Sequence, residues 1–137
     1  MLAVPVDRLE IGNLIPVEAV AVRQDGEWIR IQIDTGDYGV GYTVEEAYMD
    51  LRETAIGTVY LDTAKWLVLD RQTVNMIKGI NGYLKRNVRV CINENADNLE
   101  EIAVYLNAHK PTVSIRHMET GISPQVLEKE SDGYRLK

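Results

Sequence analysis

An Asp-Thr-Gly triplet is the pattern in this sequence that comes closest to a catalytic site. Asp34, Thr35 and Gly36 follow the largely apolar run at residues 31–33, and Asp62 and Thr63 partly repeat the triplet. Two aspartates held side by side can share one proton and activate a water molecule for hydrolysis. A chain of 137 residues could supply one such aspartate from each subunit of a homodimer.

The triplet resembles the active-site loop of retroviral-type aspartic proteases, so a small homodimeric protease that uses Asp34-Thr35-Gly36 is one alternative function. Those proteases consist almost entirely of β-strands, whereas this sequence contains three helix-capping patterns. A late strand of two apolar residues and a glycine, which such proteases place beneath the catalytic loop, is not found. We therefore expect Asp34 to end a strand and begin a turn, and we expect the chain not to be an enzyme.

A glycine-rich segment, Gly36–Gly41, precedes a predicted helix. Helix N-termini attract anions, which makes the segment a candidate phosphate loop. Its spacing fits neither a dinucleotide-binding loop nor a Walker loop, and Glu45 and Glu46 in the first helical turn would repel phosphate. We reject the phosphate site and keep a small-molecule-binding module that uses the Gly36–Gly41 loop as a second alternative.

The histidines and the cysteine give no metal site in the sequence. His109 and His117 have no second histidine or cysteine at ligand spacing, and we expect His109 to lie near a helix C-terminus. Cys91 is the only cysteine and lies in an apolar segment. We expect it to be a buried small side chain and not a reactive thiol. No cofactor and no metal ion are therefore expected.

Composition and charge indicate one acidic globular domain, which we assign to residues 1–137. The formal net charge of −6 argues against nucleic-acid binding, since that binding depends on contacts of Lys and Arg with phosphates. No run of 18 apolar residues is present that would predict a membrane span. The tail from Ser123 is polar, and we expect it to fray.

A hairpin is the first strong structural signal. Asp25-Gly26 lies between two strand-like runs and favours a two-residue turn. With these two residues as the loop, Val22 faces Ile29, and alternation then separates an apolar face from a mostly polar one. The predicted inward set is Val20, Val22, Ile29, Ile31 and Ile33, and the outward set is Ala21, Arg23, Trp28, Arg30 and Gln32.

Capping residues and apolar spacing predict about three helices. Thr43 and Glu46 form a capping box before the first, Asp70 could cap a second over residues 72–85, and Asn98 starts a third. Strands are predicted near residues 58–61, 65–69 and 88–93. The resulting order, β-β-α-β-α-β-α, predicts an α/β fold, with α+β as the variant, built on a mixed sheet. One core is expected to contain Val20, Val22, Ile29, Ile31, Leu51, Val68, Val90 and Leu106.

The polar face of the hairpin is a candidate interaction surface. It presents Arg23, Trp28 and Arg30, and aromatic residues and arginine are the types enriched at the centre of protein interfaces. Trp28 lies beside a turn, so its ring could also do no more than cover its own sheet. These three residues are the predicted site.

Several short motifs follow one another in a recognisable order. The series opens at Asp7-Arg8-Leu9-Glu10-Ile11 and continues through the hairpin over residues 17–33 to Gly41-Tyr42-Thr43-Val44-Glu45-Glu46-Ala47 with Leu51. It ends with segments at residues 59–69, 84–92 and 96–106. Together these segments resemble the N-terminal domain of the Ger(x)C family, the C subunits of bacterial spore germinant receptors.

This resemblance implies a domain that acts in spore germination through contacts with other receptor or envelope protein subunits. Family members are lipoproteins with a Cys-Trp pair just before the first motif, where this chain has Val6 and no cysteine. We therefore expect a location on the extracytoplasmic side of a membrane, with attachment only through an anchor that is not present in this chain.

Overall fold

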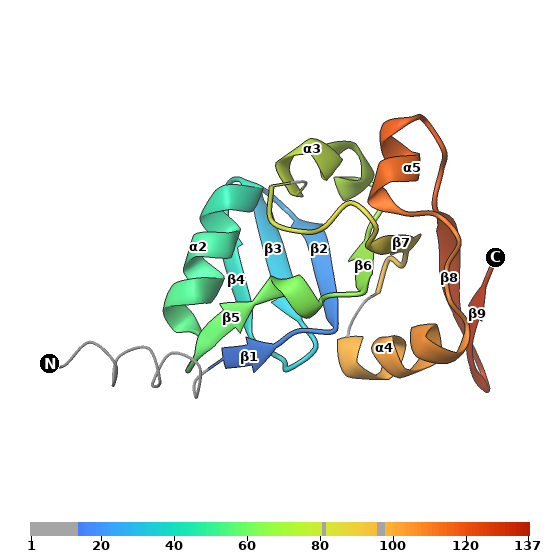
Figure 1. Ribbon diagram of the computed structural model, residues 1–137, viewed down its shortest axis with the longest axis horizontal. Coiled ribbons are helices and arrows are strands. Elements are labelled where there is room, and N and C mark those ends of the chain that lie inside the picture. Colours follow the sequence, from blue (N-terminus) through green and yellow to red (C-terminus); the bar gives the residue numbers. More distant parts are fainter. Residues whose placement is uncertain (1–13, 81, 96–97) are drawn as a thin grey trace, which may run out of the picture.

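Seven strands form one mixed β-sheet that runs through the molecule (Figure 1). The structure is a computed structural model, and it describes residues 14–80, 82–95 and 98–137. Within these residues the strand order is β4-β3-β2-β6-β7-β8-β9. The strands are β2 (Ala19–Asp25), β3 (Trp28–Ile33), β4 (Tyr38–Gly41), β6 (Trp66–Leu69), β7 (Arg89–Ile92), β8 (Gln125–Glu130) and β9 (Gly133–Leu136).

Strand direction divides this sheet into a parallel centre and antiparallel ends. Strands β2, β6, β7 and β8 run parallel to one another, whereas β3 and β4 at one end and β9 at the other pair antiparallel. A separate parallel pair consists of β1 (Leu14–Pro16) and β5 (Thr58–Tyr60). The predicted α/β class, with a mixed sheet that opens on an antiparallel hairpin, is confirmed.

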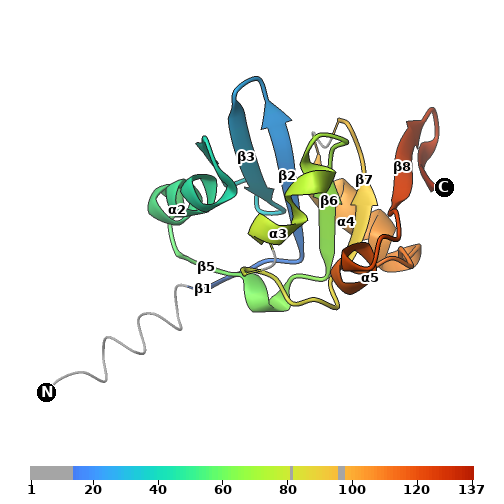
Figure 2. The ribbon, with the colours of Figure 1, turned by 90° about the horizontal axis from the view of Figure 1, so that it is seen from above.

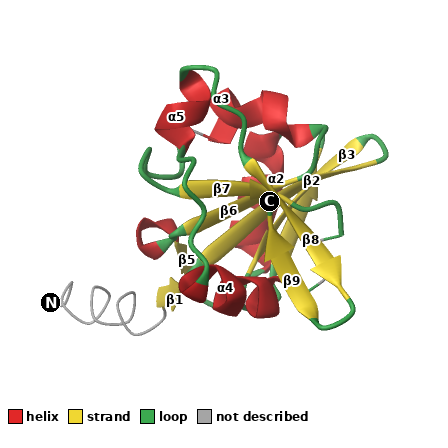
Figure 3. Ribbon diagram, turned by 90° about the vertical axis from the view of Figure 1, so that its right-hand side faces the viewer, coloured by secondary structure: helices red, strands yellow, loops and turns green. Residues whose placement is uncertain are grey.

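Helices cover both faces of the sheet, and each face has its own apolar core (Figure 3). The first core lies under α2 (Val44–Thr54), α3 (Ile77–Ile80) and α5 (Ile115–Glu119), and the second lies under α4 (Leu99–Ala108). All eight predicted core residues are buried. The expectation of one core is wrong, because Val68 and Leu106 belong to the second. Central parallel strands are buried on both faces, so β6 is apolar throughout.

The predicted register of the hairpin is wrong by two residues. Val22 pairs with Ile31 and Val20 with Ile33, so the loop consists of Gly26 and Glu27. Gly26 has a φ of 64°, which suits the first central position of a primed turn. A shift of two residues keeps every side chain on its face, so the predicted inward set is buried in the first core. Of the outward set, Ala21 is also buried, beneath α4.

Glycines 39 and 41 lie in strand β4, where the sequence predicted a loop. A Cβ atom at Gly39 would lie 2.2 Å from Leu51 N and 2.3 Å from Ala47 O, and a Cβ at Gly41 would lie 2.5 Å from Glu46 Cβ. The backbone of α2 therefore rests directly on the inward side of β4, and only glycine leaves room for that approach.

Two of the three predicted helices form as expected. Thr43 Oγ1 accepts from Glu46 N at 3.1 Å at the start of α2, and Asn98 Oδ1 accepts from Glu101 N at 3.1 Å at the start of α4. The helix predicted over residues 72–85 is wrong in extent. A 3₁₀ turn, η2 (Thr73–Met76), leads into the four-residue α3, and helix-weakening Gly79 and Gly82 stand at its end.

The tail predicted to fray from Ser123 instead forms the β8–β9 hairpin. β8 pairs with β7 through Cys91–Gln125 and Ile92–Val126, and Leu127 is buried in the second core. Tyr134 and Leu136 of β9 pack against the same core, and backbone pairing joins both strands to the sheet. The sequence motif Asp7–Ile11 of the Ger(x)C resemblance lies outside the described residues, as do residues 96–97.

Candidate interaction surface

The outward side of β2, β3 and β4 brings six side chains together in one surface, which we call the aromatic face. Tyr38 and Val40 alternate with the two buried glycines of β4, so their side chains point away from α2. The cross-strand pair of Arg30 and Val40 shows that the β3 residues project to the same side. The aromatic face consists of Arg23, Trp28, Arg30, Tyr38, Val40 and Tyr42.

Two ring contacts organise this face. Trp28 and Tyr42 stack with ring centroids 4.3 Å apart and an angle of 19° between their planes. Trp28 nevertheless remains 44% exposed and Tyr42 61% exposed. Arg30 places its guanidinium carbon 4.1 Å from the centroid of the Tyr38 ring, a cation–π contact. The rings hold one another in fixed orientations while their outer surfaces stay open to solvent.

The two predicted arginines differ in what they bind. Arg23 Nη2 donates to the backbone oxygen of Glu94 at 2.6 Å, which ties the hairpin to the segment after β7. Arg30 Nε is buried and has no hydrogen-bond partner among the described residues. An unpaired buried donor is costly and is normally satisfied by a partner. The Nε atom is closed to solvent, so any contact of Arg30 with another molecule has to be made by the rest of its guanidinium, which lies over the Tyr38 ring.

The aromatic face stays open because α4 covers only the neighbouring part of the sheet. Figure 2 shows α4 behind β6 and β7, while α2 lies at the β3 end on the other side. Small side chains such as Ala19 and Ala21 line the part that α4 covers. The larger, exposed side chains of β3 and β4 begin where that cover ends.

The free edge of β4 is closed to strand addition by side chains of α2. Three residues spaced four apart on the helix bind the backbone groups that point away from β3. The contacts are Tyr42 N to Glu46 Oε2 (3.2 Å), Val40 N to Asp50 Oδ2 (2.8 Å) and Thr54 Oγ1 to Tyr38 O (3.3 Å). Edge strands need such protection against unwanted pairing. A partner would accordingly meet the side chains of the face and not the strand edge.

Asp34 takes part in backbone bonding at the base of the hairpin. Its Oδ1 accepts from Glu18 N at 2.8 Å and from Ala19 N at 3.1 Å, where β2 begins. Thr35 Oγ1 donates to Asp37 Oδ2 at 2.7 Å, and Gly36 has a φ of 97°. The triplet forms the β3–β4 turn, and both described contacts of the Asp34 carboxylate are with backbone N–H groups.

The remaining candidates for chemistry have structural contacts. Burial raises the pKa of the Cys91 thiol to about 12, so the group stays protonated at neutral pH. His109 is the C-cap of α4 and stacks on Tyr105, and His117 belongs to the capping box of α5. Among the described residues no group of three His, Cys, Asp or Glu side chains could hold a metal ion.

Sequence reasoning found Arg23, Trp28 and Arg30 but missed the half of the face that β4 supplies. Tyr38, Val40 and Tyr42 alternate with glycines, a period of two that predicts a strand once the glycines are taken as inward residues.

Within the described parts of the chain no helix has the length and apolar character needed to cross a membrane. Comparison with protein-family models, curated proteins and solved structures found no match to this chain.

Proposed function

We propose that this chain is a non-catalytic interaction domain of a spore germinant-receptor-like assembly, similar to the N-terminal domain of Ger(x)C proteins. The observation that carries the proposal is the aromatic face, where the Trp28–Tyr42 stack and the Arg30–Tyr38 contact lie on an uncovered part of the sheet. Aromatic side chains and arginine dominate the binding energy of protein interfaces. The short motifs that resemble the Ger(x)C domain supply the biological setting.

The chemistry of the face indicates what its partner presents. Arg30 places a partly buried guanidinium on this face, and a carboxylate is the acceptor that a guanidinium binds most strongly. Trp28 and Tyr42 offer an apolar surface beside it. The partner is therefore another receptor or envelope subunit that carries an acidic side chain next to an apolar patch, at the extracytoplasmic side of a membrane.

Replacing Trp28 and Arg30 by alanine tests this proposal. Both side chains lie on the open face, so we expect each change to cost only about 1 kcal/mol of folding stability. Loss of interface anchors typically costs 2 kcal/mol or more of binding free energy, so assembly should weaken by about 30-fold or more. The measurements are thermal unfolding of the purified domain and, in the native host, receptor assembly and germination.

The matched controls are Val104→Ala and Arg116→Ala, which remove an exposed apolar and an exposed basic side chain from α4 and α5. Assembly should tolerate both. Normal assembly and germination with Trp28→Ala and Arg30→Ala, in a domain that remains folded, would refute the interface. A chemical activity of the purified domain alone would refute the non-catalytic assignment.

A further inference from the structure

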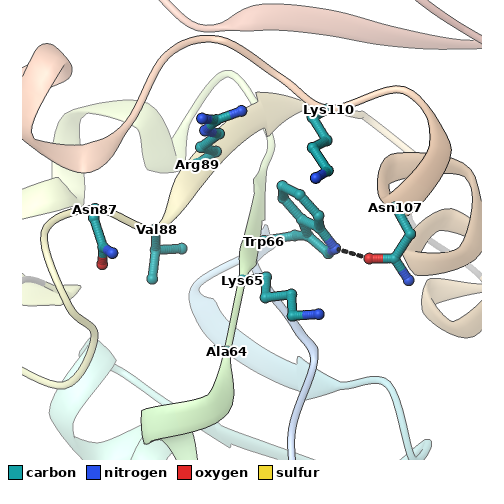
Figure 4. Close-up of a pocket in the computed structure, with 8 residues that line it drawn as sticks. All are labelled: Ala64, Lys65, Trp66, Asn87, Val88, Arg89, Asn107 and Lys110. Atoms are coloured by element: carbon teal, nitrogen blue, oxygen red, sulfur yellow. Dashed lines mark hydrogen bonds between the residues drawn. The ribbon is translucent and has the colours of Figure 1, made fainter.

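A hollow of about 540 Å³ opens at the amino-terminal ends of β6 and β7 (Figure 4), and no residue of the aromatic face lines it. Its walls come from three separate parts of the chain. Its polar and aromatic lining residues are Lys65, Trp66, Asn87, Arg89, Asn107 and Lys110. Three of these are cations, in a chain whose formal net charge is −6. Local positive charge of this kind stands out against an acidic protein.

The fold explains how these residues meet. Trp66 and Arg89 are cross-strand partners in the parallel pair of β6 and β7, and Lys65 immediately precedes β6. Helix α4 ends at this edge of the sheet, which brings Asn107 and Lys110 to the hollow. Figure 4 shows the Trp66 indole in the centre, with the two lysines and Asn107 around it and Arg89 above the strand.

Some hydrogen-bond donors of the hollow already bind acceptors of the protein, and these bonds hold the lining side chains in place. Trp66 Nε1 donates to Asn107 Oδ1 at 3.0 Å, and Asn107 Nδ2 donates to the carboxylate of Glu18. The amide of Asn107 is thereby occupied at both ends and holds the indole in place. Arg89 Nη1 donates to Pro111 O at 3.1 Å, which orients the guanidinium.

The cationic groups themselves have no anionic partner in the described part of the chain. None of the ion pairs there includes Lys65, Arg89 or Lys110. Glu18 places one carboxylate next to the hollow, but its contact is with Asn107. The C-terminal end of α4 favours a nearby cation, which accounts for Lys110 alone. Lys65 precedes β6 and Arg89 begins β7, so the helix end does not account for these two charges.

We propose that this hollow binds a small oxyanion, the carboxylate or phosphate group of a soluble ligand. A guanidinium presents parallel donors that match two oxygens of such a group, and the two ammonium groups add charge-assisted hydrogen bonds. Trp66 is buried except for about 4% of its surface and contributes only a small apolar part of the lining. The volume lies within the range of small-molecule sites, about 300–1,000 Å³.

The chain's two tryptophans allow a direct test on the purified protein. Inorganic phosphate and succinate are titrated separately at constant ionic strength while backbone and indole N–H resonances are followed by NMR. We expect saturable shifts in the Trp66 indole signal and in residues 64–66, 87–89 and 107–110. The Trp28 indole signal should not move, because Trp28 lies on the aromatic face.

Lys65→Met and Lys110→Met remove one charge each, and Lys78→Met on α3 is the matched control. Each pocket change should weaken binding about three- to fivefold, as expected for an exposed ion pair, and Lys78→Met should leave it unchanged. Saturation with only one anion identifies phosphate or carboxylate as the group recognised. Shifts that do not saturate with either anion, or that are equal in all three variants, would overturn the proposal.

Discussion

Gly39→Ala is expected to destabilise the protein by about 3 kcal/mol or more, because the new methyl group would overlap backbone atoms that cannot move independently. The added Cβ would lie 2.2 Å from Leu51 N and 2.3 Å from Ala47 O. Relief requires α2 to move away from β4, which would also open the buried contacts of Leu51. Thermal unfolding should show a decrease in Tm of about 10 °C for a domain of this size.

Val40→Ala is the matched control for this substitution, since Val40 is the next residue of β4 and points outward. Its loss should cost well under about 1 kcal/mol, as for other exposed positions. Equal stability of the Gly39→Ala variant and the unmodified protein would contradict the close packing of α2 on β4. The packing of α2 against the glycine side of β4 is also what places Tyr38 and Val40 on the opposite, outward side, so that explanation would be lost as well.

Asp70→Ala is expected to cost about 3 kcal/mol, because it leaves one buried and one partly buried N–H group without acceptors. Asp70 is only 5% exposed and follows β6 directly. Its Oδ1 accepts from Thr73 N at 2.7 Å, and its Oδ2 accepts from Gln24 N at 2.8 Å. One carboxylate thus fixes both the start of η2 and the end of β2. Urea unfolding of the variant should show a lower midpoint with an unchanged slope.

Two comparisons test the contribution of the Asp70 hydrogen bonds. Asp70→Asn keeps one acceptor oxygen, so its cost should be smaller than that of Asp70→Ala. Asp62→Ala removes an exposed carboxylate, whose contact is Tyr60 Oη at 3.2 Å, and should change stability by less than about 0.5 kcal/mol. If Asp70→Ala were as mild as Asp62→Ala, the buried bonds could not have the role assigned to them.

Local patterns in the sequence were sufficient for the faces of the hairpin but not for its register. The inward residues were identified by their period of two, and that pattern is unchanged by a shift of two positions. Deciding between loops at 25–26 and 26–27 requires knowing that Gly26 is the first central residue of the turn. The N-caps at Thr43 and Asn98 were predictable because a cap is a local contact between a side chain and the next helical turn.

Features that depend on distant segments were not predictable in this way. Gly39 and Gly41 look like loop residues until α2 is known to lie against them. The tail looks too polar to be ordered, and its strands form because β7 offers a free edge in the described fold. For the same reason the cations of the pocket were missed, since Lys65, Arg89 and Lys110 come from separate segments of the chain.

Site-specific photo-crosslinking in the native host tests the interface proposal most directly. A benzophenone side chain replaces the exposed Tyr42 of the aromatic face or, as control, Val104 on α4, which is 67% exposed. The account predicts that position 42 forms an adduct with another receptor or envelope subunit and that Arg30→Ala abolishes it, while position 104 forms none. Failure of position 42 to crosslink, or equal crosslinking from position 104, would contradict the assignment of this face as the interface.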